Sequence, residues 1–268
     1  MTSAQTRLVC LLGHPVDHSV SPQIHAAAFA AAGVDAVYLA FDVDPADLAA
    51  AVAGLRALRF TGANITVPHK TAVWDLVDAH TPEAEAVGAV NTLYWADGRL
   101  VADNTDAAGL QAVLEDLSVR AGDGVVVFGA GGAARAAAVA LGRLGARVEV
   151  VARRDDAAAD VAALARRMGA EVGRVVDPRL VVNATPLGLR GEVLPERFMH
   201  LSAGQTALDL VYGPGDTPFL AAARRGGADA RDGLAMLVAQ AARSFERWAG
   251  VPAPVAEMHA AAWAALGR

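Results

Sequence analysis

The chain has 268 residues, 54% hydrophobic and 19% charged, so it can bury a sizeable core and is not a disordered protein. Its net charge of −6, with no basic run of five residues, excludes nucleic acid and acidic membrane surfaces as expected partners. The single cysteine, Cys10, excludes a disulfide framework, and no Cys/His group has metal spacing, so we expect no metal site.

The sequence shows no pattern typical of a targeting signal or a membrane span. The N-terminal stretch lacks the pattern of a signal peptide, and no run of about 18 apolar residues could span a membrane. We therefore expect a cytoplasmic protein. The length favours two domains.

The first half alternates strand-like and helix-like segments. Strands are expected at residues 8–12, 37–41 and 63–67, and a hairpin is expected from strands 91–95 and 99–104 around Ala96-Asp97-Gly98. A capping residue followed by proline opens each expected helix, at Ser21-Pro22, Asp44-Pro45 and Thr81-Pro82. The first two of these helices should reach Ala32 and about Leu58.

The second half is more regular. After a helix at 106–117, the expected strands are 125–128, 148–152, 181–185 and 207–212. The expected helices run to Leu144 and then cover 155–168, 217–225, 234–248 and 254–266. Strands that alternate with helices of this length predict an α/β fold with a mostly parallel sheet.

The most specific local motif is the glycine loop Gly129-Ala130-Gly131-Gly132-Ala133-Ala134, which lies between an expected strand and helix. The first glycine permits the tight turn, the second lets a pyrophosphate approach the backbone, and the small residue at 134 lets helix and strand pack closely. Free N–H groups at the helix start hold the anion. The pattern favours dinucleotide binding over a turn that is needed only for packing.

The end of the next strand bears on which dinucleotide binds. An NAD site has an acidic residue there, whereas this chain has Arg153 and Arg154, which suit a 2′-phosphate. Asp155 and Asp156 follow at once. The arginines could instead form a solvated turn, and either aspartate could be a helix N-cap. We favour NADP and leave NAD use open.

Polar residues also follow the strands of the first half. Lys70 comes just after the strand 63–67, where ligands bind in open α/β sheets, so it is either a surface cation or a catalytic acid/base. Ser19 and Ser21 are two residues apart in an extended stretch, so their hydroxyls could bind one carboxylate. Ser21 could also serve only as the cap of the helix that follows.

Amide and carboxylate side chains add a second group of candidates. Asn91 and the run Asp103–Asp106 lie on the two arms of the hairpin and suit a polyol, although turn and cap chemistry would also explain them. Gln240 is the interior amide of an apolar helix and lies one turn after Met236. The alternative for Gln240 is an exposed polar position.

Seven motifs in this order carry a family resemblance: HSVSP, ANITVPHK, GAVNT, DNTD, GAGGAAR, NATPLG and DGLAMLVAQ. From about Leu8 to Trp248 the chain resembles the shikimate dehydrogenase family. The resemblance implies NADPH-dependent, reversible reduction of 3-dehydroshikimate to shikimate, a step of aromatic amino-acid biosynthesis. It also implies a substrate domain of residues 1–106 and 235–268, and a Rossmann-type NADP domain of residues 107–234.

The same resemblance assigns roles to individual residues. It implies that Lys70 and Asp106 are the catalytic pair and that Ser19 and Ser21 hold the substrate carboxylate. The ring hydroxyls would be bound by Thr66, Asn91, Asp106 and Gln240, with Tyr212 close by. The cofactor would contact the loop of residues 129–134 together with Arg153, Arg154, Thr185, Val211, Gly233 and Met236.

Some positions depart from the family pattern. The run Ala152-Arg153-Arg154-Asp155 resembles the quinate/shikimate branch, which can use NAD as well. Ala107 stands where glycine is usual, and His69 replaces a more common aromatic residue. A quinate/shikimate dehydrogenase is therefore one alternative, and a non-catalytic dinucleotide-binding sensor is a more distant one. Monomer and homodimer both stay open.

Overall fold

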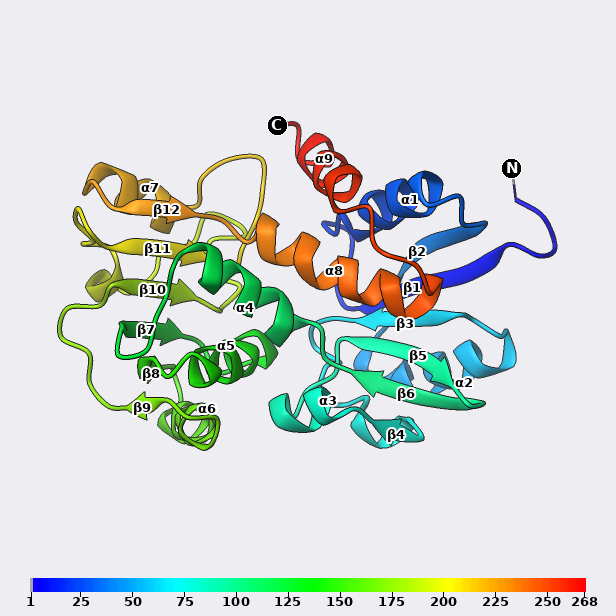
Figure 1. Cartoon of the computed structure of the whole chain (residues 1–268), viewed down its shortest axis with the longest axis horizontal. Helices are drawn as coiled ribbons and strands as arrows, with labels where there is room; N and C mark the ends of the chain where they lie inside the picture. The colour runs from blue at the N-terminus through cyan, green and yellow to red at the C-terminus, as the bar shows by residue number, and fades with distance from the viewer. Residues whose placement is uncertain (1) are drawn as a thin grey trace. The chain divides into compact units, whose positions relative to one another are not determined.

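The structure is a computed structural model that describes residues 2–268, and it divides into two compact units. One unit contains residues 2–106 and returns for Val238–Arg268, and the other is Ala107–Leu237. Each unit has its own six-stranded sheet. The predicted α/β fold, with C-terminal helices that return to the N-terminal unit, is confirmed (Figure 1).

The first unit is built on a mixed sheet with the strand order β2-β1-β3-β5-β6-β4. Its strands are β1 (Arg7–Gly13), β2 (Ala36–Asp42), β3 (Gly62–Ile65), β4 (Ala79–His80), β5 (Thr92–Ala96) and β6 (Arg99–Asp103). Strands β2, β1 and β3 are parallel, whereas β5 runs antiparallel to both β3 and β6. The predicted hairpin is therefore confirmed, with its turn at Asp97-Gly98.

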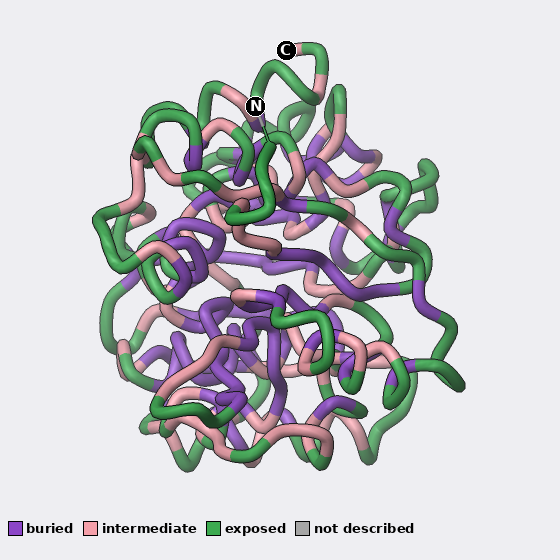
Figure 2. The backbone as a smooth tube through the Cα atoms, turned by 90° about the vertical axis from the view of Figure 1, so that its right-hand side faces the viewer, coloured by how far each residue is buried: buried purple, intermediate pink, exposed green. Residues whose placement is uncertain are grey.

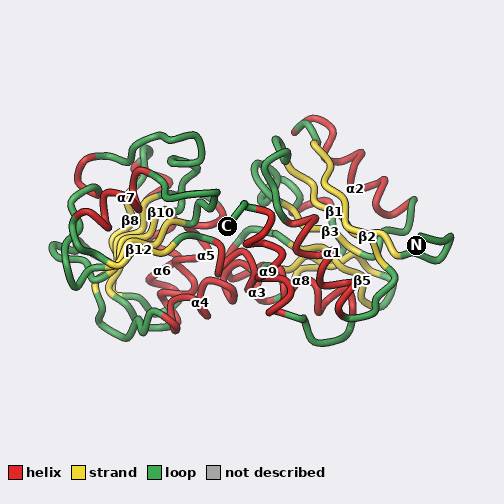
Figure 3. Tube along the Cα trace, turned by 90° about the horizontal axis from the view of Figure 1, so that it is seen from above, coloured by secondary structure: helices red, strands yellow, loops and turns green. Residues whose placement is uncertain are grey.

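Helices cover both faces of this sheet. They are α1 (Ser21–Ala31), α2 (Leu48–Ala57), α3 (Pro82–Val87), α9 (Val255–Ala265) and most of α8 (Leu234–Ala249). Leu48, Val52 and Leu55 of α2 pack into one core with Cys10 and Leu12 of β1. Helix α1 lies on the opposite face (Figure 3). The central strands β1 and β3 are largely buried, and Figure 2 shows the buried stretches of the chain in purple.

One glycine fixes the position of helix α8 on this sheet. A Cβ atom on Gly62 of β3 would lie 2.2 Å from Nε1 of Trp248, so only glycine leaves room for the indole. Trp248 then donates from Nε1 to the carbonyl of Leu93 on β5 at 2.9 Å. This contact holds the helix that carries Gln240 against the strands that carry the other polar residues.

The second unit has an all-parallel sheet with the order β12-β11-β10-β7-β8-β9. Its strands are β7 (Gly124–Phe128), β8 (Arg147–Val151), β9 (Glu171–Val172), β10 (Leu180–Asn183), β11 (Thr206–Asp209) and β12 (Asp229–Arg231). Its helices are α4 (Asp106–Asp116), α5 (Gly132–Arg143), α6 (Asp155–Arg167) and α7 (Pro218–Arg225). This is the predicted Rossmann-type arrangement of βαβ units.

Some element ends differ from the sequence predictions. The strand expected at 63–67 ends at Ile65, and Val67, 67% exposed, precedes a cis proline. The strands expected at 181–185 and 207–212 end at Asn183 and Asp209, where side-chain hydrogen bonds to the backbone replace strand pairing. Strands β4, β9 and β12 were not predicted, because two or three residues are too short to show a period of two.

The helix caps show a second set of differences. Thr81 caps α3 and Asp44 caps the 3₁₀ turn at Pro45–Asp47, as the sequence predicts. Ser21 is not a cap, because α1 begins at Ser21 itself and Val20 occupies the N-cap position. Neither Asp155 nor Asp156 caps α6, since both lie in its first turn after Arg154. Among residues 2–268, no helix combines the length and the apolar character needed to cross a membrane.

Candidate active site

Sheet topology brings the polar motifs of the first unit together at one end of the strands, beyond the carboxyl ends of β1 and β3. Because β1 and β3 are parallel neighbours, the loop with Ser19 and the loop from Thr66 to Lys70 leave the sheet at the same end. Asn91 reaches that end because β5 is antiparallel to β3, and its carbonyl accepts from Ile65 N–H at 2.9 Å. Thr92 pairs with Asp103, so the run that ends at Asp106 also leaves β6 there.

Lys70 and Asp106 form a close ion pair at this end of the strands. Lys70 Nζ lies 2.6 Å from Asp106 Oδ2, and the two side chains are only 18% and 5% exposed. Asp106 begins α4, and its backbone N–H donates to Asn104 Oδ1 at 3.0 Å. An ammonium group and a carboxylate held together with little water can exchange a proton with a ligand, which an exposed lysine on a surface loop is not placed to do.

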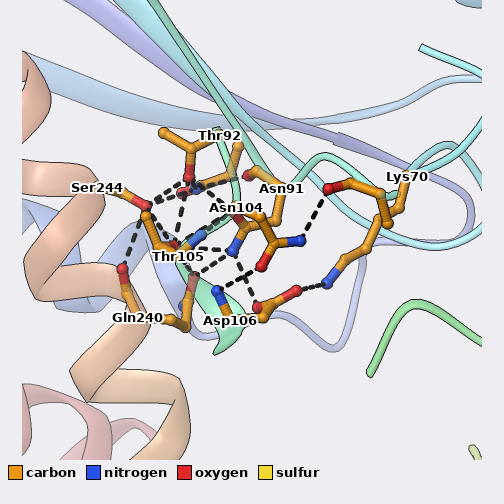
Figure 4. A network of polar contacts seen from close by, with 10 residues as sticks. Lys70, Asn91, Thr92, Asn104, Thr105, Asp106, Gln240 and Ser244 are labelled. Carbon is orange, nitrogen blue, oxygen red and sulfur yellow. Dashed lines mark hydrogen bonds and ion pairs between the residues drawn. The ribbon is translucent and has the colours of Figure 1, made fainter. Parts of the chain in front are cut away.

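The Asn91 amide contacts the other oxygen of Asp106. Asn91 Nδ2 donates to Asp106 Oδ1 at 2.9 Å and to Gln240 Oε1 at 3.2 Å. The backbone N–H of Thr105 donates to Asn91 Oδ1 at 2.8 Å, and this contact is one of those that orient the amide with its nitrogen toward the carboxylate. Lys70, Asn91, Asp106 and Gln240 therefore share one hydrogen-bonded cluster, which Figure 4 shows.

A layer of buried polar side chains lies behind this cluster. It consists of Asn64, Thr92, Thr105 and Ser244. Of these, the sequence predictions had included only Thr105, as a member of the run Asp103–Asp106. Asn64 interrupts the buried run Ala63–Ile65, and such a polar residue inside a buried strand was a signal available in the sequence. Ser244 carried no such signal, because serine is common on exposed helix faces.

Ser19, Ser21 and Thr66, three further substrate candidates, lie at the same end of the strands with contacts of their own. The Ser19 hydroxyl accepts from the backbone N–H of Ser21 at 3.3 Å, so Ser19 does part of the capping that was predicted for Ser21. Thr66 N–H donates to the carbonyl of Leu12 at 2.9 Å. A Cβ atom on Gly13 would lie 2.2 Å from the Thr66 methyl group, so the glycine gives this side chain its room.

Asp103 and His69 have structural contacts. Asp103 is buried and accepts from Thr81 Oγ1 at 2.6 Å and from Arg247 Nε at 2.9 Å, which ties the hairpin to α8. The His69 ring is buried, with Nε2 2.8 Å from the carbonyl of Val43. In the run Asp103–Asp106, it is Asp106 whose carboxylate contacts Lys70.

The glycine loop of the second unit has the geometry that its sequence predicts. Gly129 has φ of +136°, and a Cβ atom there would lie 2.6 Å from the carbonyl oxygen of Ala184. Gly131 is the N-cap of α5, and a Cβ atom on it would meet nothing within 4 Å. Ala134 is fully buried against the sheet.

The first turn of α5 can also receive an anion. No described side chain caps this helix, and its first turn contains no acidic residue. Its first N–H groups are therefore available, together with the positive end of the helix dipole. The residues of the loop fit a dinucleotide pyrophosphate.

The two arginines after β8 differ in their surroundings. Both are exposed and follow the strand that pairs with β7, so they leave the sheet at the same edge as the glycine loop. Arg154 Nε lies 3.4 Å from Asp156 Oδ1, whereas Arg153 has no ion-pair partner among residues 2–268. A surface pair of this kind contributes little, but it engages Arg154. Arg153 is the guanidinium group better placed to receive a phosphate.

The loops that follow β10 and β11 form a pocket of about 330 Å³ within the second unit. Its lining includes Val211 and Tyr212 from the predicted cofactor and substrate residues. Asn183 shapes the adjoining loop, because its Oδ1 accepts from the hydroxyl of Thr185 at 2.7 Å. The sequence predictions missed this role, and they also missed Asp209, described next.

Asp209 is the buried carboxylate that holds this pocket together. It accepts from Asn183 Nδ2 at 2.8 Å, from the Thr217 hydroxyl at 2.6 Å and from the backbone N–H of Val211 at 3.0 Å. Burial raises the pKa of Asp209, although these three hydrogen bonds oppose the shift. The side chain thus fixes the loops on which Thr185 and Val211 lie.

Gly233 and Met236 complete the predicted cofactor residues. A Cβ atom on Gly233 would lie 2.3 Å from the carbonyl oxygen of Leu210, so no larger residue fits there. Met236 is half-buried in the first turn of α8. Both belong to the second unit, as do the glycine loop and the two arginines.

Together, the parallel sheet with its glycine loop and the buried lysine–carboxylate pair define a class: a two-domain α/β oxidoreductase that works with a dinucleotide. Family models for the shikimate dehydrogenase substrate-binding domain and the shikimate 5′-dehydrogenase C-terminal domain match residues 11–93 and 233–262. The NADP(+) shikimate dehydrogenase of Moorella thermoacetica is 46% identical over 98% of this chain and 95% of its own length.

Solved structures agree with this match. A shikimate dehydrogenase in complex with NADP+ has a TM-score of 0.91 and 33% identity, over 100% of this chain and 98% of its own. The Thermus thermophilus shikimate 5-dehydrogenase with NADP(H) and shikimate has a TM-score of 0.84 and 36% identity, over 97% of this chain and 100% of its own. The chain belongs to the shikimate dehydrogenase family.

Proposed function

We propose that this protein catalyses the reversible, NADPH-dependent reduction of 3-dehydroshikimate to shikimate. The observation that carries the proposal is the buried pair of Lys70 and Asp106, held by Asn91 at the edge of the sheet where ligands bind. Relatives support it, since the Moorella thermoacetica protein is named for NADP(+) and the Thermus thermophilus structure contains shikimate with NADP(H).

Lys70 is proposed to handle the proton. Reduction of a ketone places negative charge on its oxygen, and an ammonium group beside that oxygen stabilises the charge and then donates a proton. NADPH, when bound, would supply the hydride. Asp106, 2.6 Å from Lys70 Nζ, orients the lysine and accepts from a substrate hydroxyl. In the oxidative direction, the lysine amine accepts the proton.

The other polar residues at this edge are proposed to bind the substrate. Ser19 and Ser21 hold its carboxylate, while Thr66, Asn91 and Gln240 bind its ring hydroxyls. Tyr212, which lines the pocket of the second unit, is proposed as a further substrate-binding residue. Each of these side chains except Gln240 follows or precedes a strand, where a hydroxyl, amide or phenol can face a ligand.

Residues 1–106 and 235–268 are proposed as the substrate domain, and residues 107–234 as the NADP domain. The N–H groups at the start of α5 would bind the pyrophosphate, and Arg153, assisted by Arg154, would bind the 2′-phosphate. Thr185, Val211, Gly233 and Met236 would contact the rest of the cofactor. We place the protein in the cytoplasm, as a monomer or homodimer with small-molecule partners.

One observation favours an alternative function, that of a quinate/shikimate dehydrogenase that uses NAD. Asp155 directly follows the two arginines and could accept from the ribose of NAD, as in the quinate/shikimate branch. A non-catalytic sensor is less well supported, because it would have no use for a buried lysine–aspartate pair. Steady-state oxidation of shikimate and of quinate, each with NADP+ and with NAD+, tests the choice. Turnover with shikimate and NADP+ supports the proposal, and preferential use of quinate or NAD+ supports the alternative.

A further inference from the structure

The Asn91 amide is the link between the Lys70–Asp106 pair and the protein interior. Its Nδ2 donates to Asp106 Oδ1 at 2.9 Å, while Lys70 occupies Oδ2. If the amide rotated, its carbonyl oxygen would face the carboxylate and repel it. The orientation of this one side chain therefore decides how Asp106 is held.

The hydroxyl of Thr92 is one of the groups that set this orientation. Thr92 lies in β5, is fully buried, and places Oγ1 2.9 Å from Asn91 Oδ1. Thr92 Oγ1 also lies 2.7 Å from Ser244 Oγ on α8. A hydroxyl has one proton, so which of these contacts it donates to depends on its neighbours.

Asn64 resolves the direction of these hydrogen bonds. Its Nδ2 lies 3.0 Å from the carbonyl oxygen of Asn91, which can only accept, so the nitrogen is on that side. Its Oδ1 then accepts from the Tyr38 hydroxyl at 2.8 Å. The same Nδ2 donates to Thr92 Oγ1 at 3.2 Å, which leaves the Thr92 proton for Asn91 Oδ1. Ser244 Oγ, 2.7 Å from Thr92 Oγ1, can donate its own proton to the carbonyl of Gln240 at 3.2 Å.

The contacts thus form one directed chain of donors. It runs through Tyr38, Asn64, Thr92, Asn91 and Asp106. Bonds that all run in one direction polarise one another and strengthen the last members of the chain. Here the last acceptor is the carboxylate that contacts Lys70.

We propose that Thr92 is a positioning residue, whose hydroxyl holds the Asn91 amide so that its NH₂ group faces Asp106. The inference rests on the proposed dehydrogenase activity, since it concerns how that reaction's acid–base pair is held. Thr92 acts through Asn91 and contacts neither Lys70 nor Asp106 in the described hydrogen bonds.

The test compares two substitutions that separate the hydroxyl from the shape of the side chain. Thr92→Val keeps the branched shape and removes the hydroxyl, whereas Thr92→Ser keeps the hydroxyl and removes the methyl group. We expect Thr92→Val to lower kcat/KM for shikimate roughly ten- to hundredfold, because small misplacements of acid–base groups have effects of this size. Thr92→Ser should stay within about threefold of the wild type.

Two further variants test how the loss of activity depends on the distance of the changed residue from Asn91 in the hydrogen-bond network. Ser244→Ala should cost less than Thr92→Val, because Thr92 can still donate to Asn91, and Tyr38→Phe should cost least. Ser244→Ala also serves if Thr92→Val does not fold, in which case a loss of severalfold or more is expected. All rates are measured below the unfolding temperature of each variant, which is followed by circular dichroism.

Each outcome has a clear meaning. Full activity in Thr92→Val with a loss in Thr92→Ser would assign the role to the methyl group and overturn the inference. A loss in Tyr38→Phe as large as that in Thr92→Val would indicate general disruption and would also overturn it. A wild type that is inactive on shikimate overturns the proposed function, and this inference with it. An active wild type whose variants show either of the two patterns above overturns this inference alone.

Discussion

Acid should destabilise the first unit through one buried histidine. His25 of α1 is fully buried, stacked on Tyr38 with ring centres 4.4 Å apart and 5.2 Å from the ring of Trp248. Neither ring nitrogen has a hydrogen-bond partner among residues 2–268. Burial lowers the pKa of His25 from 6.5 to about 3, although the neighbouring Asn64 side chain opposes part of the shift.

The sign and size of the effect follow from proton linkage. Between pH 6.5 and about 3 the unfolded chain protonates this histidine and the folded chain does not, so the contribution to stability is present above 6.5 and is lost as the pH falls. Each pH unit corresponds to about 1.4 kcal/mol. At about pH 4.5, two units below 6.5, the loss reaches about 3 kcal/mol, a large share of the ~5–15 kcal/mol typical of a domain.

Urea unfolding of the wild type and of His25→Phe at about pH 7 and 4.5 measures this difference. The phenylalanine ring keeps the stack and cannot be protonated. All four tryptophans, Trp74, Trp95, Trp248 and Trp263, belong to the first unit, so their fluorescence reports its unfolding. The wild type should lose about 3 kcal/mol more than His25→Phe on acidification.

His259→Phe, a change at an exposed histidine of the same unit, is the matched control and should behave like the wild type. Equal losses in the wild type and in His25→Phe would refute the reasoning.

Three further predictions concern the proposed activity. Lys70→Ala should lower kcat about 10²–10⁴-fold with shikimate affinity largely kept, because one acid–base group is lost while the other contacts remain; more than about a tenth of wild-type kcat would remove Lys70 from the mechanism. Ser19→Ala and Ser21→Ala should each raise KM more than they lower kcat, because each removes a hydrogen bond to a carboxylate worth about 1.5–3 kcal/mol; unchanged shikimate affinity by calorimetry would make that serine structural. Arg153→Ala should weaken NADP+ and leave NAD+ nearly unchanged, and the wild type should prefer NADP+ by more than about tenfold in kcat/KM; equal use of both would show that Asp155 matters as much as the arginine.

Local signals in the sequence predicted most of the fold. The glycine loop and the β-branched run before it predicted β7 and α5, since the turn needs a left-handed φ that only glycine adopts easily. The pair Ser21-Pro22 was misread because the same two residues fit the first helical positions, and only the backbone at Val20 distinguishes these alternatives. Strand ends at Asn183 and Asp209 depended on side-chain contacts that no local pattern reveals.

The candidate site also contains residues that the sequence predicted and residues that it did not. Lys70, Asn91, Asp106 and Gln240 stood out as polar residues at strand ends or inside an apolar helix, and the structure brings them into one cluster. In the layer behind them, Asn64 carried a signal as a polar residue in a buried strand, but its contacts could not be predicted, because they join it to Thr92 and Ser244 from elements far apart in the sequence. Whether such a buried hydroxyl has partners is decided by tertiary packing alone.

The most direct test of the central claim is to incubate the purified protein with 3-dehydroshikimate and NADPH and to identify the product by NMR. The account predicts that NADPH is consumed one for one with the formation of shikimate, and that Lys70→Ala, folded like the wild type, forms product at least about a hundredfold more slowly. No consumption of NADPH by the folded wild type, or formation of shikimate at the same rate by Lys70→Ala, would contradict it.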